Sequence, residues 1–152
     1  MTSFVVDASV AIKWMVEEPG ADLAVLLLDH ALAAPDLLGP ECANILWKKV
    51  MRRELALAEA ETMAAALENA DIALHPTRGC WRAAVAVAST LRHPAYDCIY
   101  LCLAEQLAQP MVTADERLVA AVRAAPSRRF ADLVVPLTEL PQTLAQGSTQ
   151  GS

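Results

Sequence analysis

The sequence predicts an α/β fold with a central, mainly parallel sheet of four to five strands that is flanked by helices. Three observations lead to this prediction. Short apolar segments alternate along the chain with longer segments of helical pattern. These short segments are apolar almost throughout, as is usual for strands buried on both faces. Hydrophobic residues make up 55% of the chain and aromatic residues only 5%, which suits aliphatic helices packed on a sheet.

The first part of the chain predicts a strand, two helices and a second short extended segment. Residues 3–6 are short, apolar and β-branched, which favours a buried strand. A short helix is expected over residues 9–16. A second helix begins after Pro19-Gly20, within "EEPGADLAVLLLDHAL". The segment "AAPDLL" around Pro35 is interpreted as a short strand or turn.

The middle of the chain predicts four helices and one strand. A longer helix lies in "GPECANILWKKVMRREL", with Pro40 in its first turn, where the missing N–H of proline is tolerated. Another helix covers "LAEAETMAAALENA". The segment "DIALHPT" predicts a strand that ends at Pro76. Helices then cover roughly residues 78–91 and 96–108, and the second of them begins after Pro94.

The C-terminal part predicts two short strands around one helix. "PMVT" is the first strand, residues 115–125 form the helix, and "FADLVVPL" holds the last strand. Pro136 and Pro141 argue against a long regular element after it. The final "QGSTQGS" is typical of a polar, flexible tail. We therefore expect one domain over residues 1–142 and a flexible tail over residues 143–152.

Two acidic residues directly follow predicted strands. Asp7 directly follows the first strand, and Asp115 follows "PMVT" after one intervening residue, Ala114. In parallel α/β sheets, ligands bind beyond the carboxyl ends of the strands, so both carboxylates are expected at the functional edge. The alternative is that each acid only caps the helix that comes after it.

Two further acids, Glu41 and Asp97, lie in the first turns of predicted helices. Taken singly, each is explained by a favourable interaction with the helix dipole of about 0.3–1 kcal/mol. Taken with Asp7 and Asp115, they form a set of four acids at the starts of elements. Converging carboxylates repel one another unless a cation offsets their charge, and all-oxygen ligands select Mg²⁺ or Mn²⁺. Such ions support attack on a phosphodiester.

These acids lie in four segments that carry a resemblance to a known family. The segments are "VVDASV", "PECANILWK", "AYDCIYLCLAE" and "MVTADERL". Over roughly residues 3–140, the chain resembles the PIN-domain ribonucleases, specifically VapC-type toxins of type II toxin–antitoxin pairs. The resemblance implies a PIN-like three-layer sandwich, a carboxylate pocket that binds Mg²⁺ or Mn²⁺, and endonucleolytic cleavage of RNA. It also implies a homodimer and a small VapB-like antitoxin that blocks the pocket.

The resemblance also assigns roles to individual residues. The catalytic and metal-binding positions are Asp7, Glu41, Asp97 and Asp115. Ser9 and Thr113 match small hydroxyl residues beside the first and last acids, where a hydroxyl orients a carboxylate or a metal-bound water; helix capping is the alternative role. Asn44, one helical turn after Glu41 on the same face, is placed to hydrogen-bond into the site.

Charge and hydropathy limit the possible partners. The net charge of −6 argues mildly against nucleic acid, although "WKKVMRRE" places four basic residues on adjoining faces of one helix. This cluster is either a solvated helix face or a binding patch. No apolar run approaches the ~20 residues of a membrane helix, and no basic leader precedes Asp7, so we expect a cytoplasmic protein without a membrane segment. The four cysteines are expected to be buried free thiols.

Three alternatives compete with the nuclease. A phospho-receiver module needs paired acids after the first strand and a lysine after the last, whereas Asp7 stands alone there and no lysine follows Lys49. A phosphohydrolase with an aspartate nucleophile needs a second aspartate two residues later, where Ser9 stands. A PIN domain that only binds its partner, without catalysis, remains the other alternative.

Overall fold

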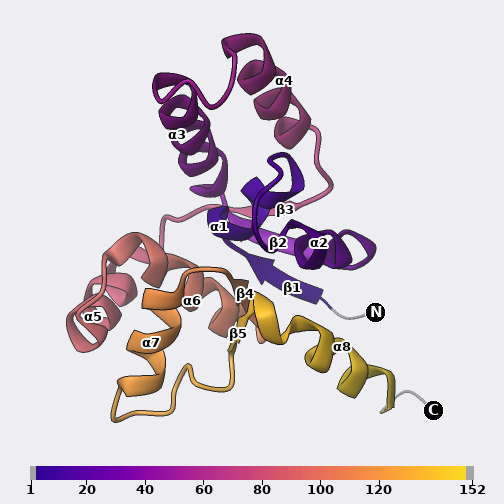
Figure 1. Cartoon of the computed structure of the whole chain (residues 1–152). Helices are drawn as coiled ribbons and strands as arrows, with labels where there is room; N and C mark the ends of the chain where they lie inside the picture. Colours follow the sequence, from indigo (N-terminus) through magenta and orange to yellow (C-terminus); the bar gives the residue numbers. More distant parts are fainter. Residues whose placement is uncertain (1–2, 150–152) are drawn as a thin grey trace.

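Five parallel strands form one sheet at the centre of the computed structural model, which describes residues 3–149 (Figure 1). The strands are β1 (Ser3–Val6), β2 (Ala31–Pro35), β3 (Ala73–His75), β4 (Met111–Thr113) and β5 (Val134–Pro136). Every neighbouring pair is parallel; Phe4 lies opposite Leu32 of β2, and Val5 lies opposite Met111 of β4. The predicted α/β fold with a parallel sheet is therefore confirmed.

The order in which strands are added to the sheet reverses at β1. The sheet runs β3-β2-β1-β4-β5, so β2 and β3 lie on one side of β1, and β4 and β5 lie on the other. In doubly wound sheets, the crevice for ligands opens at such a switch point, beyond the carboxyl ends of the two strands. In this chain, those ends are Val6 on β1 and Thr113 on β4.

Helices connect the strands and cover both faces of the sheet. The α-helices are α1 (Ala8–Ala11), α2 (Ala21–Ala24), α3 (Leu38–Met51), α4 (Leu57–Glu68), α5 (Trp81–Leu91), α6 (Ala95–Leu107), α7 (Glu116–Ala124) and α8 (Leu140–Thr149). Three short 3₁₀ helices are η1 (Ile12–Trp14), η2 (Val25–Asp29) and η3 (Leu137–Glu139). All elements that the sequence predicts are present, with ends that differ by a few residues.

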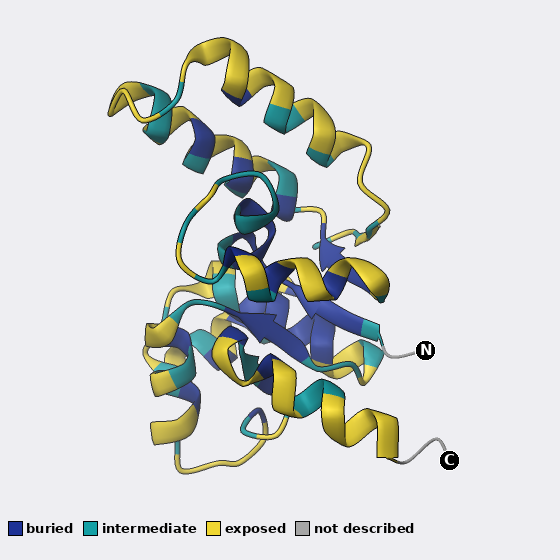
Figure 2. Ribbon diagram, turned by 45° about the vertical axis from the view of Figure 1, so that its right-hand side comes forward, coloured by how far each residue is buried: buried dark blue, intermediate teal, exposed yellow. Residues whose placement is uncertain are grey.

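Alternate residues of β1 and β4 pack against different layers of helices, as the two-residue period of a strand requires. Val5 and Met111 belong to the core cluster that includes the buried residues of α5, α6 and α7. Phe4 and Val112 belong to the opposite cluster, which includes residues of α2, η2, η3 and α8. Figure 2 shows the buried strands between these exposed helical layers. This arrangement is the expected three-layer sandwich.

The helices α3 and α4 form a pair that extends away from the sheet (Figure 1). A third, smaller core joins them to η1 through the buried residues Ile12, Leu46 and Ala60. The first turn of α3 contains Pro40 and Glu41, so the amino-terminal end of this helix holds an acid while most of its length projects outward. The basic residues Lys48 and Lys49 lie in the last turn of α3, at the opposite end of this helix from Glu41.

The C-terminal segment differs from the sequence prediction. Residues 143–149, expected as part of a flexible tail, continue helix α8 from Leu140 to Thr149. Pro141 lies in the first turn, where proline is tolerated. Leu140 is buried and Leu144 packs beside it against the core, and this apolar face supports the helix despite its polar composition. Residues 150–152 of the predicted tail lie outside the described residues.

Two other expectations concern membrane-spanning helices and cysteines. Within residues 3–149, no helix is both long enough and apolar enough to span a bilayer. The four cysteines, Cys42, Cys80, Cys98 and Cys102, are buried and unpaired, as predicted.

Candidate metal centre

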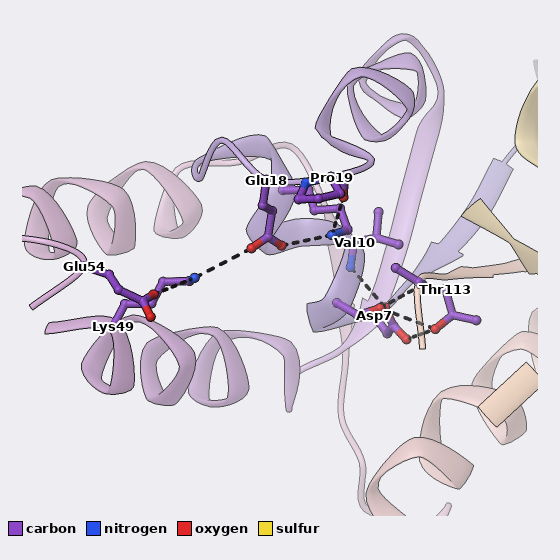
Figure 3. A network of polar contacts seen from close by, with 10 residues as sticks. Asp7, Val10, Glu18, Pro19, Lys49, Glu54 and Thr113 are labelled. Carbon is purple, nitrogen blue, oxygen red and sulfur yellow. Dashed lines mark hydrogen bonds and ion pairs between the residues drawn. The ribbon is translucent and has the colours of Figure 1, made fainter. Parts of the chain in front are cut away.

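Asp7 lies at the carboxyl end of β1 and is only 4% exposed. Its Oδ1 caps α1 by accepting from the N–H of Val10, at 3.2 Å, and also accepts from Oγ of Ser9. Its Oδ2 accepts from Oγ1 of Thr113, as the close view in Figure 3 shows. Burial raises the pKa of Asp7 to about 6, although these three donors favour the ionised form.

Ser9 and Thr113 connect the ends of the two central strands. Oγ of Ser9 accepts from the N–H of Ala114 at 2.9 Å while it donates to Asp7. Oγ1 of Thr113 likewise accepts from the N–H of Asp115 at 3.0 Å. Both hydroxyls therefore orient the Asp7 carboxylate, and neither caps a helix. Of the two roles considered for them, orientation of a carboxylate is the one that the hydrogen bonds support.

Asp115 begins α7 and caps it. Its Oδ1 accepts from the N–H groups of Arg117, at 2.9 Å, and Leu118, at 3.3 Å. The capping interpretation is thus correct for this residue. Capping uses Oδ1 of Asp115. The Asp115 carboxylate also lies near a second acid, Asp97. One oxygen atom of each acid and one ring nitrogen of His93 all lie within 4.8 Å of one another.

Asp97 lies in the first turn of α6, which packs beneath β1, β2 and β4. Its Oδ2 is 2.6 Å from Nε2 of His93, four residues earlier. Burial raises the pKa of Asp97, the hydrogen bond from His93 opposes this shift, and the negative charge of Asp115 adds to it. Asp97 is therefore held between a donor on one side and a repelling carboxylate on the other.

Glu41 approaches the same region from the first turn of α3. Its Oε1 accepts from the hydroxyl of Tyr100 at 2.6 Å, which joins α3 to α6 across 59 positions of sequence. Burial raises the pKa of Glu41, and the charge of Asp97 adds to this rise. The Tyr100 side chain is fully buried, so its hydroxyl has a fixed direction toward Glu41.

The four predicted acids are linked electrostatically through Asp97. The charge of Asp97 contributes to the raised pKa values of Asp7 and Glu41, and the charge of Asp115 contributes to that of Asp97. One oxygen of Asp97 and one of Asp115 lie within 4.8 Å of each other, close enough to share a cation, whereas Asp7 and Glu41 are linked to Asp97 through its charge. This donor set of carboxylate oxygens fits Mg²⁺ or Mn²⁺, with Asp97 and Asp115 best placed to hold the ion.

Two residues of this region were not predicted from the sequence, and one predicted residue makes no polar contact there. His93 and Tyr100 each hydrogen-bond to one of the acids. Their positions relative to Asp97, four before and three after it, are compatible with one helical face, but that spacing also describes many core residues. Asn44 is exposed on α3, and its side chain forms no hydrogen bond within residues 3–149.

A sequence model of the PIN domain matches residues 4–124, and this range includes all four acids. The chain belongs to the PIN domain family. PIN domains are generally nucleases that use divalent metal ions, which agrees with the donor set described above. A comparison with curated proteins finds no match.

The PIN fold is also found in a solved structure. The crystal structure of PAE2754 from Pyrobaculum aerophilum superposes with a TM-score of 0.68 and covers 95% of this chain and 90% of its own. The two sequences are 22% identical, so the likeness concerns the fold alone.

Two cavities of this PIN domain are lined in part by Ser9 or Thr113, the two residues whose hydroxyls contact Asp7, although none of the four acids lines either cavity. One, of about 370 Å³, is lined by Ser9 and Ala114 and by four basic residues: Lys13, Lys48, Lys49 and Arg52. Glu18 pairs with Lys13 at 3.0 Å and with Lys49 at 3.6 Å, as Figure 3 shows for the labelled residues. The other cavity, of about 610 Å³, is lined by Thr113 and Ala114 and by residues of α7 and η3.

Proposed function

We propose that this PIN domain is a metal-dependent endoribonuclease and the VapC-type toxin of a toxin–antitoxin pair. The observation that carries the proposal is the close approach of Asp97 and Asp115, whose carboxylates each place an oxygen within 4.8 Å of the other, with Asp7 and Glu41 near enough for the charge of Asp97 to act on them. Helix capping alone does not require these acids to lie near one another, and the repulsion between their charges lowers the stability of the fold.

The four acids are the proposed catalytic and metal-binding residues. A bound Mg²⁺ or Mn²⁺ would polarise the scissile phosphate and activate water for attack. Asp97 and Asp115 would hold the ion, while Ser9 and Thr113 fix the orientation of Asp7 at the end of β1. Tyr100 fixes that of Glu41. The protein's own contribution is thus a set of carboxylates whose directions are set before substrate arrives.

RNA is the proposed substrate, and the basic cavity supports it. The chain carries a net charge of −6, but the field that a phosphate meets is local. The cavity that contains Ser9 is also lined by Lys48 of α3 and by Arg52, the residue that follows this helix, and neither of these two forms an ion pair within the described residues. They are free to contact phosphates on one side of the scissile bond.

The remaining partners follow from the resemblance to VapC-type toxins. We propose a VapB-like antitoxin that blocks the acidic pocket, a homodimeric chain and a cytoplasmic location. The exposed apolar side chains Trp47 and Met51 on α3 offer surface to a protein partner, and the four free cysteines suit a reducing compartment.

The nuclease proposal is tested with the purified chain and RNA of single-stranded or looped structure. We expect cleavage with Mg²⁺ or Mn²⁺, none in excess chelator, and none by the Asp97→Asn variant in either condition. The variant controls for contaminating nucleases, which would act equally in both preparations. Full activity in chelator would contradict metal dependence. Metal and RNA binding without cleavage would indicate the alternative, a PIN domain that serves only as a binding module.

A further inference from the structure

His93 lies next to the acidic cluster, and the proposed function assigns it no role. It occupies the turn between α5 and α6, with a side chain that is 8% exposed. Its Nε2 is 2.6 Å from Oδ2 of Asp97, and one of its ring nitrogens belongs to the same compact group of ligand atoms as Asp97 and Asp115. His93 is therefore an imidazole in contact with a candidate metal ligand, and it is not one of the four carboxylates to which the proposed function assigns a role.

The backbone of the α5–α6 turn fixes the position of this histidine. Arg92 ends α5 in the left-handed conformation, with φ 54° and ψ 48°. The N–H of His93 then donates to the carbonyl of Ala88 at 3.2 Å, and its own carbonyl accepts a weak bond from Sγ of Cys98. Pro94 follows and starts α6. The ring is therefore placed by a closed turn, and it loses little freedom when it contacts Asp97.

The direction of the hydrogen bond follows from the state that Asp97 must adopt. A carboxylate that binds a cation is ionised and can only accept hydrogen bonds. The Nε2 of His93 therefore carries the hydrogen and donates it to Oδ2. A ring nitrogen that carries a hydrogen has no lone pair for a metal ion, so the Nε2 of His93 contacts the ligand rather than the cation.

The contact also opposes the repulsion inside the cluster. Asp115 presents a like charge to Asp97, and the Asp97 carboxylate would be expected to turn away from it in the absence of metal. His93 holds one oxygen of Asp97 from the side of the α5–α6 turn. This contact keeps the carboxylate of Asp97 beside that of Asp115 before a cation binds.

We propose that His93 is a positioning residue of the metal centre, which orients Asp97 through the Nε2–H to Oδ2 hydrogen bond. The proposal rests on the metal-dependent function proposed above. Hydrogen-bond partners of metal ligands typically contribute 10–100-fold to metal affinity, and we expect a loss of about that size when this donor is removed.

The test is a calorimetric titration of the full chain with Mn²⁺, at a temperature well below unfolding. His93→Leu removes the donor and should weaken Mn²⁺ binding about 10–100-fold. His93→Gln places an amide donor near the position of Nε2 and should retain most of the affinity. His75→Leu on β3 is the matched control, since His75 lies outside the acidic cluster, and its affinity should equal that of the parent.

These outcomes separate positioning from other roles. A role limited to folding would lower the melting temperature of His93→Leu but leave the Mn²⁺ affinity of its folded form unchanged, and that result would overturn the proposal. Electron spin-echo spectra of bound Mn²⁺ that show a directly bound imidazole nitrogen, lost in His93→Leu, would also overturn it. Should that variant not fold, His93→Asn, whose amide is too short for this contact, takes its place. A parent chain that binds no Mn²⁺ would instead contradict the metal centre itself.

Discussion

At Asp7 and Asp115, one carboxylate performs two tasks. Each caps the helix that follows it, through bonds to the N–H groups of Val10 or of Arg117 and Leu118. Each also belongs to a group of acids that influence one another. The capping and metal-site interpretations of the sequence are therefore compatible. A helix N-terminus stabilises a negative charge, and this offsets part of the repulsion between neighbouring carboxylates.

The acids were predictable from the sequence, but their hydrogen-bond partners were not. Each acid follows a strand or begins a helix, so parallel-sheet rules place the group at one edge. The partnership of Glu41 with Tyr100 depends on how α3 and α6 pack, and no local pattern encodes that contact. The partnership of His93 with Asp97 depends on the left-handed residue Arg92, which a sequence does not reveal unless it is glycine or asparagine.

Replacement of Asp97 by Asn tests the cluster through stability and needs no substrate. In chelator, we expect the variant to be at least as stable as the parent, because the change removes one charge from a group of mutually repelling acids. Mg²⁺ should then stabilise the parent, by about 2.7 kcal/mol at one hundred times the dissociation constant, and the variant much less. Thermal melts of both proteins with and without Mg²⁺ provide the measurement.

The same thermal melts give a different result if the only role of Asp97 is a favourable interaction with the dipole of its helix. Asn would then cost a few tenths of a kcal/mol in chelator, and Mg²⁺ would shift both proteins alike. Equal shifts would remove Asp97 from the metal site.

The buried carboxyl of Asp7 should make the metal-free protein less stable as pH rises. Its pKa is raised from 3.8 to about 6, so between these values the folded chain holds a proton that the unfolded chain has released. Over this interval the free energy of unfolding falls with pH, by roughly 3 kcal/mol in total for this one group. Asp7→Asn removes the titration. Urea unfolding in chelator from pH 4 to pH 7 should show the parent losing stability relative to the variant, whereas parallel profiles would contradict the prediction.

At the scale of elements, local patterns identified the strands and most helices, but failed at α8. Pro136, Pro141 and the polar composition of the last residues argue against a long helix after β5. The prolines lie before the helix and in its first turn, where they are tolerated, and the tertiary packing of Leu140 and Leu144 supplies the stability that propensity lacks. Helix propensity is a weak guide wherever an apolar face meets an existing core.

Helix α3 provides a prediction about RNA binding. We expect Lys48→Ala and Arg52→Ala to weaken RNA binding and to reduce the slope of log affinity against log salt by about 1 for each phosphate that the variant no longer neutralises. The reason is that both residues line the cavity that contains Ser9, beside Asp7. Binding of RNA to a chain inactivated by Asp97→Asn, measured at several salt concentrations, keeps cleavage out of the measurement.

Arg128→Ala is the matched control, since Arg128 is an exposed basic residue that lines neither cavity beside the site. It should leave affinity and slope close to those of the parent. Unchanged values for all three variants would make the basic face of α3 a solvated surface.

At the scale of the whole molecule, the sequence predicted the class of fold but not the order of its strands. Alternation of strands and helices requires parallel pairing and right-handed crossovers, yet several strand orders satisfy both conditions. The observed order depends on which helical faces pack together, and α5 against α6 is the most extensive of these helix pairings. The long α5–α6 connection between β3 and β4 carries the chain to the far side of β1, which creates the switch point where the site lies.

The apolar residues of the early helices are divided between core and surface. Ile12 and Leu46 are buried in the core between η1, α3 and α4. Trp47 on the same helix is 56% exposed. Further exposed apolar residues lie one turn apart on α5, at Trp81 and Val85. Surface for association therefore exists, on α3 and on α5.

Self-association of the chain is a prediction that this surface supports. At micromolar concentration and without any antitoxin, we expect sedimentation equilibrium to give twice the chain mass of 16.3 kDa. A charge placed in an apolar interface is left unpaired on burial, so an aspartate on the interface should yield a monomer. Met51→Asp and Val85→Asp examine the two faces separately, and both residues are more than half exposed, so neither change should unfold the chain. A parent that sediments as a monomer would contradict the prediction, whereas dissociation by one variant alone would locate the interface on α3 or on α5.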